Sequence, residues 1–252
     1  LKQTPNGWKI ISKTATRLKE SPKKGKVLFI VSNAHFYGNT ELRTGNGFSE
    51  IVNAYDVFVQ AGYTIDFVSP KGGAIPLSYI NTSDTLAKQY LYDADFMYAI
   101  KHTLPPEHIT ASDYKAVHYV GGGNAMYGVA KNPMIQKISM EIYEKHNGII
   151  SSVCHGTAGI AFLKNTNGEY LVSGKSISGY PDEYENPNKA YFKQFPFKIT
   201  ETIERHGGTL KYSARDQQHV EIDGRIVTGQ NYLSSSKVAQ EMIKMIESQA
   251  IN

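Results

Sequence analysis

The sequence predicts an α/β fold in which helices flank a doubly wound, mostly parallel sheet. The first observation is a set of apolar runs of strand length, at residues 26–32, 64–68, 116–120 and 148–153. Continuous apolar runs are typical of strands that helices cover on both faces. The second observation is the helical pattern between the first two runs. A strand, a helix and a strand at this spacing form a right-handed βαβ unit with parallel strands.

Helices and strands alternate along most of the chain. A polar loop at 33–46 follows the first strand and leads to a helix at 48–60, which Gly62 ends. This helix places five apolar side chains on one stripe: Ile51, Val52, Tyr55, Phe58 and Val59. The later elements are a helix at 133–146, a short helix at 157–163, a helix at 197–205, a hairpin at 221–227 around Asp223-Gly224, and an amphipathic helix at 236–248.

Two irregular segments interrupt this alternation. Residues 75–112 are rich in Tyr and only weakly helical around 83–92, and residues 179–197 are rich in Tyr, Asn and Pro. No linker rich in Pro, Gly or Ser separates two domains. We therefore predict a basic polar leader at 1–25 and a single α/β domain at 26–252, whose two insertions roof a pocket at the strand ends.

Composition and charge exclude several classes of protein. A disulfide within the chain and a Cys-rich zinc site are impossible, because Cys154 is the only cysteine among 252 residues. No apolar run approaches the roughly 20 residues of a membrane-spanning helix. The net charge of +4 comes from the leader, which carries +6, so the remaining chain is nearly neutral at −2. We interpret the leader as a solvated extension and expect neither a nucleic-acid nor a membrane partner.

The expected location is the cytoplasm. The chain begins at Leu1 without Met and holds no apolar signal-peptide core, which is also compatible with a processed, exported form.

The end of the strand at 148–153 is the segment that indicates a catalytic site. Cys154 follows this apolar strand directly, and small residues allow a sharp turn into the next helix. Such a nucleophile elbow exposes a reactive side chain at the top of a sheet. A helix N-terminus beside the sulfur would also favour the thiolate. Most free cysteines are small buried hydrophobes, but the strand, the glycines and the following His155 favour a nucleophile here.

Three further groups gather at the same edge of the predicted sheet. Adjacent side chains point apart, so we expect His155 to orient the site or to pair with a carboxylate rather than to act as a simple base on Cys154. The Gly121-Gly122-Gly123 cluster can supply backbone N–H groups for an oxyanion hole, or simply a tight turn. Glu50, in the first turns of its helix among apolar and small residues, is a candidate for a buried, protonated carboxyl group.

No cofactor or metal site emerges from the sequence. A phosphate-binding loop is absent because no Lys-Ser/Thr follows the glycines, and there is no G-x-G-x-x-G. Four histidines lack the spacing of metal ligands: His35, His102, His108 and His118. We expect neither a cofactor nor a metal.

Taken together, these residues resemble the ThiJ/PfpI superfamily, within the flavodoxin-like, class I glutamine amidotransferase-like fold. The likeness runs from Lys26 to the end and is strongest for the glutathione-independent glyoxalase (glyoxalase III) and heat-shock chaperone (HchA-like) branch. The motifs that carry it are Thr44-Gly45 with Glu50, Val68 to Gly73, Asp113 to Val117, Ser152-Val-Cys154-His155-Gly156, Gly174 to Gly179, Phe195-Pro-Phe197 and Asp223 to Asn231.

The resemblance implies a role for each of these groups. Cys154 matches the nucleophile, Glu50 the carboxyl group that contacts it, and His155 the histidine after the nucleophile. Glu185 matches the acidic partner of that histidine, with Asp182 and Glu183 as alternatives. Oxyanion stabilisation falls to Gly122, Gly123 and the backbone at His155. The pair His219 and Glu221, which an amidotransferase would use, lies in the predicted hairpin and is interpreted as strand.

The chain departs from the branch at three places. The branch commonly has Gly-Gly-His-Gly where this chain has Gly122-Gly123-Asn124-Ala125. Its Gln-Asn-Pro is replaced by Gln230-Asn231-Tyr232, and the loop at 35–43 is longer. These changes affect the pocket and therefore the choice of substrate.

The function that the resemblance implies is a cofactor-free lyase of the glyoxalase III (D-lactate dehydratase) type. It would convert a small reactive carbonyl, a 2-oxoaldehyde such as methylglyoxal, to a 2-hydroxy acid such as lactate, and it would form a homodimer. Two alternatives remain open: a cysteine peptidase or amidase of the PfpI type, and a redox-responsive holdase chaperone in which Cys154 is oxidised.

Overall fold

The computed structural model describes residues 2–4, 7–9 and 24–250. Most of the leader predicted at 1–25 therefore lies outside the described residues. Within it, strands β1 (Lys2–Thr4) and β2 (Gly7–Lys9) pair antiparallel.

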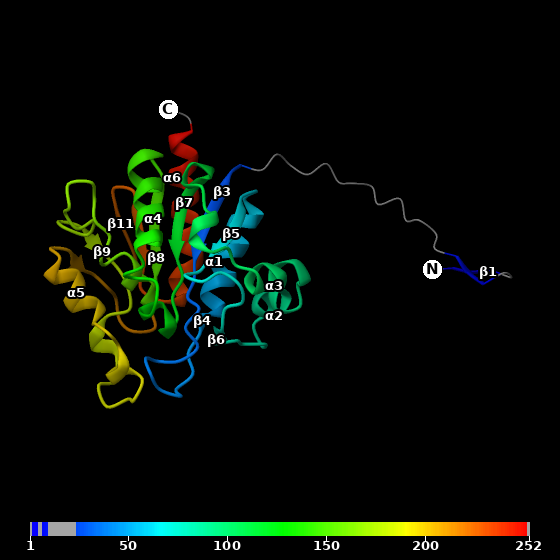
Figure 1. The fold of residues 1–252 in the computed structure, drawn as a ribbon, viewed down its shortest axis with the longest axis horizontal. Helices are drawn as coiled ribbons and strands as arrows, with labels where there is room; N and C mark the ends of the chain where they lie inside the picture. Colours follow the sequence, from blue (N-terminus) through cyan, green and yellow to red (C-terminus); the bar gives the residue numbers. More distant parts are fainter. Residues whose placement is uncertain (1, 5–6, 10–23, 251–252) are drawn as a thin grey trace.

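A six-stranded sheet forms the centre of the structure, in the order β11-β12-β8-β7-β3-β5 (Figure 1). Its strands are β3 (Lys26–Ile30), β5 (Thr64–Val68), β7 (Tyr114–Tyr119), β8 (Ile149–Val153), β11 (Val220–Asp223) and β12 (Ile226–Gly229). All neighbouring pairs are parallel except β11 with β12, the predicted hairpin. The prediction of a mostly parallel α/β sheet is confirmed.

Helices cover both faces of the sheet, as the apolar strands require. One core lies under α1 (Phe48–Gln60) and α6 (Ser235–Gln249), and the other under α4 (Pro133–Lys145) and α5 (Ile199–Arg205). Shorter parallel pairs join β4 (Asn46–Gly47) to β6 (Leu77–Ser78) and β9 (Ser176–Ile177) to β10 (Thr209–Leu210). The predicted stripe of α1 is correct except for Val59, which is 39% exposed.

The topology brings three segments that follow strands to one edge of the sheet. The chain leaves β3 for β5 on one side and returns to β7 on the other, so the order of the strands reverses between β3 and β7. Ligand sites in open α/β sheets form at such a reversal, beyond the carboxyl ends of the strands. The segments that follow β3, β7 and β8 carry Glu50, Gly121 and Cys154, respectively.

The first insertion is more regular than the sequence suggested. It contains α2 (Thr85–Leu91) and α3 (Ala94–Lys101), which lie beside α1 and β5 in Figure 1. The side chain of Asp84 caps α2, and that of Asp93 caps α3 by accepting from the Phe96 N–H at 2.8 Å. Short polar residues at a helix start satisfy free N–H groups, so these two aspartates allow brief helices in an otherwise irregular stretch.

The prediction of a short α-helix at 157–163 is wrong. A 3-10 helix spans Cys154–Gly159 instead, and the chain continues as turns. The side chain of Thr157 explains the change, because its hydroxyl donates to the Ser178 carbonyl at 3.0 Å and lies 2.8 Å from the Ser152 hydroxyl. These contacts hold the tighter turn against the neighbouring segment, where an α-helix would have turned the hydroxyl away.

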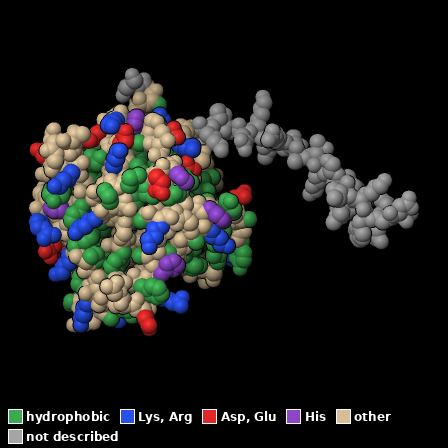
Figure 2. All heavy atoms as spheres, in the orientation of Figure 1, with side chains coloured by type: hydrophobic (Ala, Val, Ile, Leu, Met, Phe, Trp, Pro, Cys, Tyr) green, Lys and Arg blue, Asp and Glu red, His purple; other side chains and the backbone are tan. Residues whose placement is uncertain are grey.

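The described surface is mixed in charge. Lysines and arginines are intermingled with acidic side chains over the face shown in Figure 2. None of the helices that the structure describes has the length and apolar character needed to cross a membrane.

Candidate active site

Cys154 lies at the carboxyl end of β8 in a strained backbone conformation. Its φ is +56°, a left-handed value that non-glycine residues rarely adopt. The next turn can approach the sheet because Gly156 has no side chain, since a Cβ there would overlap the Tyr119 carbonyl oxygen. Cys154 is 7% exposed and lines a cavity. The elbow predicted from the sequence is therefore present, with its sulfur facing a pocket.

Glu50 places its carboxyl group beside this cysteine. It sits in the first turn of α1, is 5% exposed, and lines the same cavity. A Cβ on Gly121 would overlap Glu50 Oε2 and would come within 2.9 Å of Cys154 Cβ. The three residues thus meet at one point, which only glycine at position 121 allows.

Burial controls the protonation of Glu50. It raises the pKa of the carboxyl group to about 7, although His155, the Cys154 side chain and the Gly121 backbone each act to lower it. Glu50 Oε2 is buried and has no hydrogen-bond partner among the described residues. A carboxyl group in this setting keeps its proton to near neutral pH, as the sequence led us to expect.

The thiol of Cys154 behaves differently from the prediction. Burial raises its pKa well above the ordinary value, and the nearby Glu50 carboxylate raises it further, while the His155 backbone N–H opposes both effects. The short 3-10 turn provides less positive field than the α-helix we had expected. At rest the sulfur is therefore a thiol, and a base must remove its proton.

His155 is close enough to be that base. Its Nδ1 lies 3.5 Å from Cys154 Sγ, which corrects the expectation that these adjacent side chains point apart. The left-handed φ at Cys154 and the 3-10 turn bring the two side chains to the same side. Its Nε2 lies 2.6 Å from Glu185 Oε1. Because the carboxylate accepts the Nε2 proton, the lone pair of Nδ1 faces the sulfur.

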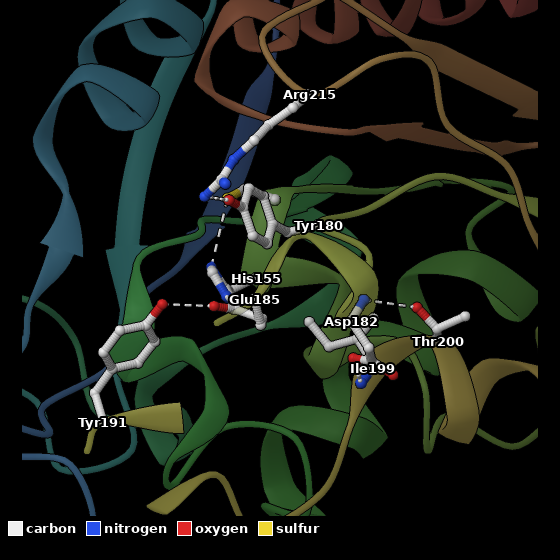
Figure 3. A network of polar contacts seen from close by, with 9 residues as sticks. His155, Tyr180, Asp182, Glu185, Tyr191, Ile199, Thr200 and Arg215 are labelled. Carbon is white, nitrogen blue, oxygen red and sulfur yellow. Dashed lines mark hydrogen bonds and ion pairs between the residues drawn. The ribbon is translucent and has the colours of Figure 1, made fainter. Parts of the chain in front are cut away.

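Glu185 is held on its other side by a tyrosine. The hydroxyl of Tyr191 donates to Glu185 Oε2 at 2.7 Å, so both carboxylate oxygens are bonded (Figure 3). Burial acts to raise the pKa of Glu185, but the bonds from His155 and Tyr191 outweigh it and hold the pKa below its ordinary value. The acid beside the histidine is charged at neutral pH.

The two alternative acids are engaged elsewhere. Asp182 accepts from the backbone N–H groups of Ile199 and Glu201 at 2.8 and 3.1 Å and so caps α5, pointing away from His155 in Figure 3. Glu183 interacts with Tyr212. Of the three candidates, only Glu185 contacts His155 in the structure.

Of the two predicted oxyanion glycines, one lines the cavity and the other does not. Gly122 has φ +103° and lines the cavity, whereas Gly123 lies beneath the ring of Tyr37. Asn124, where the branch carries a histidine, is fully buried and donates to the carbonyls of Ser32 and Ala34 at 3.2 and 3.3 Å. Asn124 therefore anchors the start of the loop after β3, and an oxyanion role for the glycines stays a prediction.

The cavity has a volume of about 510 Å³. Both predicted insertions contribute to its wall, with Tyr79 and Asn81 from the first and Tyr180 and Tyr191 from the second. The loop at 35–43 contributes Tyr37, the second insertion contributes Phe195, and Gln230, Asn231 and Tyr232, where the chain departs from the branch, also line the cavity. The sequence analysis missed Arg215 and Asp216. Loop residues have no periodicity to reveal them. For the second insertion, the tyrosine content of 179–197 was the available signal.

The structure also shows where the other ionisable residues that the sequence singled out lie. His219 and Glu221 form an ion pair at 2.9 Å at the start of β11, outside the cavity. Among the described residues, no cluster of three or more His, Cys, Asp and Glu could hold a metal ion.

Fold and site define a class of doubly wound α/β proteins with a cysteine at a strand-to-turn elbow. The chain belongs to the DJ-1/PfpI family, whose sequence pattern matches residues 44–245. It is 27% identical to the glutathione-independent glyoxalase hsp3101 of Schizosaccharomyces pombe, over 89% of this chain and 97% of that protein.

Two solved structures show the same likeness. The Rapid Encystment Protein 24 kDa of Francisella tularensis superposes with a TM-score of 0.82 and 25% identity, over 88% of this chain and 99% of that one. Glyoxalase III from Candida albicans superposes with a TM-score of 0.78 and 25% identity, over 87% and 96% of the two chains.

Proposed function

We propose that the protein is a glyoxalase of the glutathione-independent type, which converts a 2-oxoaldehyde to a 2-hydroxy acid. The observation that carries this proposal is the buried Glu50 carboxyl group beside the Cys154 sulfur, both facing one cavity. A nucleophile next to a carboxyl group whose pKa is about 7 suits a reaction that moves protons at neutral pH. The glyoxalase names of the similar proteins support the same reaction.

The first step is addition of the sulfur to the aldehyde carbon. His155 Nδ1 accepts the thiol proton from a distance of 3.5 Å, and Glu185 stabilises the resulting imidazolium. The sulfur forms a bond to C1, and the aldehyde oxygen becomes the alkoxide and then the hydroxyl of a hemithioacetal. Backbone N–H groups near Gly122 and His155 would stabilise the oxyanion.

The second step is an internal oxidation and reduction. Ionised Glu50 removes the proton on C1, and the electron pair moves through an enediol towards C2. Glu50 then returns the proton to C2, while the C1 hydroxyl proton passes to the oxygen on C2 and the C1 carbonyl forms. C1 thereby rises to the oxidation level of a thioester, and the C2 ketone becomes an alcohol. Electrons balance within the substrate. A carboxyl group with a pKa of about 7 can both accept and donate this proton.

The last step is hydrolysis of the thioester. His155 can assist attack by water at C1, and the C1–S bond breaks as the sulfur regains its proton. The product is a 2-hydroxy acid. Over the whole cycle one water is consumed for each 2-oxoaldehyde, and Cys154 is regenerated.

The shape of the site supports a small carbonyl substrate over a polypeptide. Cys154 is 7% exposed, and aromatic side chains from two insertions and the loop after β3 form the wall of its cavity. A polypeptide would have to enter between these rings to reach the sulfur. A small aldehyde fits inside the cavity.

The test is a product assay with the purified protein. Methylglyoxal is supplied, and lactate is measured enzymatically for each enantiomer. Cys154→Ala should abolish turnover, and Glu50→Gln should lower kcat by about 10²–10⁴-fold, the usual contribution of a proton-transfer group. Glu183→Gln, the same change at a glutamate outside the cavity, should retain activity. Full activity of Cys154→Ala would refute the proposal, and cleavage of peptides without lactate would favour a hydrolase.

A further inference from the structure

Arg215 is a cavity-lining cation that the proposed mechanism does not use. It lines the same cavity as Cys154 and His155. Its Nη2 donates to the Tyr180 hydroxyl at 3.0 Å, and no carboxylate lies within ion-pair distance of it among the described residues. A guanidinium group has five N–H donors in a planar fork. Most of this donor capacity remains available to a molecule inside the cavity.

Buried side chains fix the loop that carries Arg215. Gln230 is fully buried, and its amide bonds to the two residues before Arg215: Oε1 accepts from the Ser213 N–H at 2.7 Å, and Nε2 donates to the Ala214 carbonyl at 3.1 Å. Asn231, 7% exposed, donates to the Gln217 carbonyl at 2.8 Å from the other side of the loop.

Two further side chains tie down the same loop. The Tyr184 hydroxyl donates to the Ser213 carbonyl at 2.6 Å, and His219 Nδ1 lies 2.8 Å from the Ser213 hydroxyl. The loop backbone is therefore held at Ser213 and Ala214 before Arg215 and at Gln217 after it, while Arg215 itself is exposed. A group presented this way loses little conformational freedom when it binds a ligand.

Tyr180 links Arg215 to the reacting sulfur. The Tyr180 N–H donates to the Cys154 carbonyl at 3.2 Å, and the Tyr180 ring stacks on the His155 ring with centroids 4.9 Å apart. Figure 3 shows the guanidinium group reaching the outer end of this tyrosine. The guanidinium group of Arg215 thus lies beyond His155, with the Tyr180 side chain between them. It is therefore several bond lengths away from the carbon that Cys154 would attack.

The cavity also has room for more than a three-carbon aldehyde. Its volume of about 510 Å³ falls in the range of pockets that bind drug-sized ligands. The nearby carboxylates do not occupy the guanidinium group of Arg215. Glu185 is bonded to His155 and Tyr191, and Asp216 lines the cavity without an ion pair to Arg215.

We propose that Arg215 and the Tyr180 hydroxyl bind an anionic group, a carboxylate or a phosphate, on a substrate whose carbonyl reacts at Cys154. The preferred substrates are then 2-oxoaldehydes that carry a negative charge a few carbons from the aldehyde. The identity of the aldehyde rests on the proposed function, whereas the anion subsite does not. Arginine suits such a subsite because its fork matches both carboxylate and phosphate oxygens.

A kinetic comparison tests the preference. The substrates are methylglyoxal, 4,5-dioxopentanoate, the neutral methyl ester of 4,5-dioxopentanoate, and 3-phosphooxy-2-oxopropanal. Arg215→Ala should lower kcat/KM about 10- to 100-fold for the two anionic compounds, which is the range for a charged hydrogen bond. It should change kcat/KM less than about 3-fold for methylglyoxal and the ester. The ratio between the carboxylate and phosphate compounds tells which anion the subsite prefers.

Two variants serve as controls for charge and fold. Arg205→Ala removes the same charge from α5, outside the cavity, and should leave all four substrates unaffected. Arg215→Lys keeps the charge but not the fork, so it should fall between the wild type and Arg215→Ala. Equal losses for neutral and anionic substrates in Arg215→Ala would overturn the proposal.

A binding measurement separates the subsite from the reaction. Levulinate, which has the carboxylate but no aldehyde, is titrated by calorimetry into Cys154→Ser and into Cys154→Ser combined with Arg215→Ala. Its affinity should fall about 10- to 100-fold when Arg215 is lost. Equal or absent binding in both proteins overturns the subsite. If levulinate binding depends on Arg215 while no 2-oxoaldehyde is turned over by the wild type, the proposed function fails and the anion subsite stands.

Discussion

The carboxyl group of Glu50 lies against the side chain of Cys154 across the bare Cα of Gly121. The cysteine comes from the end of β8, the glutamate from the first turn of α1, and the glycine from the end of β7. Two strand ends and the start of a helix thus converge on a space that one methyl group would fill. The pairing of acid and sulfur therefore depends on a residue that touches no substrate.

Gly121→Ala should disable the site while preserving the fold. The new Cβ would overlap Glu50 Oε2 and displace the carboxyl group from the sulfur. We expect kcat for methylglyoxal to fall by about 10²–10⁴-fold, as for Glu50→Gln. Overpacking should also cost about 1–3 kcal/mol of stability. Steady-state kinetics and urea unfolding measure both effects. Wild-type kcat in Gly121→Ala would contradict this account.

The buried Glu50 should make stability fall as pH rises. The pKa of Glu50 is raised from 4.5 to about 7, so the folded protein holds this proton more tightly than the unfolded chain. The stability linked to the proton is complete below pH about 4.5 and is lost as pH rises to about 7. This loss is on the order of 3 kcal/mol relative to Glu50→Gln, which does not titrate. Urea unfolding of both proteins at pH 4.5, 6 and 7.5 measures it. Parallel pH profiles would show that the pKa is not raised.

Tyr191→Phe should shift the pH dependence of activity. Loss of the hydroxyl removes one of the bonds that lower the pKa of Glu185, so this carboxyl group would take up a proton at higher pH. Because the charged carboxylate holds His155, the acid limb of kcat/KM should move to higher pH. Tyr92→Phe, at an exposed tyrosine, provides the control. An unchanged limb with a lower plateau would mean that Tyr191 supports the fold rather than Glu185.

Asn124→Ala should destabilise the protein. The buried amide donates to the carbonyls of Ser32 and Ala34; Ser32 also accepts from Asn46 at 2.9 Å, so removal of the amide would leave the Ala34 carbonyl without this donor. A cost of about 1–3 kcal/mol is expected from the lost hydrogen bonds. Thermal or urea unfolding measures this cost. Asn188→Ala is the matched exposed change and should have little effect. A stability equal to that of the wild type would show that water replaces the amide.

The sheet and the centre of the site could be predicted because their signals are local. Cys154 follows a buried strand directly, and Glu50 lies one turn into a helix that follows another, so the ends of parallel strands bring them together. The backbone details could not be predicted. The φ of +56° at Cys154 and the 3-10 turn after it depend on contacts with Tyr119 and Ser178, which are distant in sequence.

The two insertions that contribute to the cavity wall could be predicted, but the individual side chains in the wall could not, for a different reason. Tyr37, Tyr191 and Arg215 come from three loops that have neither a helical nor a strand period. Their placement depends on tertiary contacts, such as the rings of Tyr37 and Tyr191, whose centroids lie 5.4 Å apart. The helix at Ala94–Lys101 was missed although Asp93 in front of it is a recognisable cap.

Glu185 belongs to the insertion at 179–197, whereas Cys154 and Glu50 belong to the framework of the sheet. In the proposed mechanism the framework supplies the sulfur and the acid beside it, and the insertion supplies the carboxylate that holds the base. A protease cut among the exposed residues 186–190 would separate Tyr191 from Glu185 in sequence without cutting the sheet. Exchange of this segment between relatives would give evolution a way to retune the chemistry while the fold stays the same.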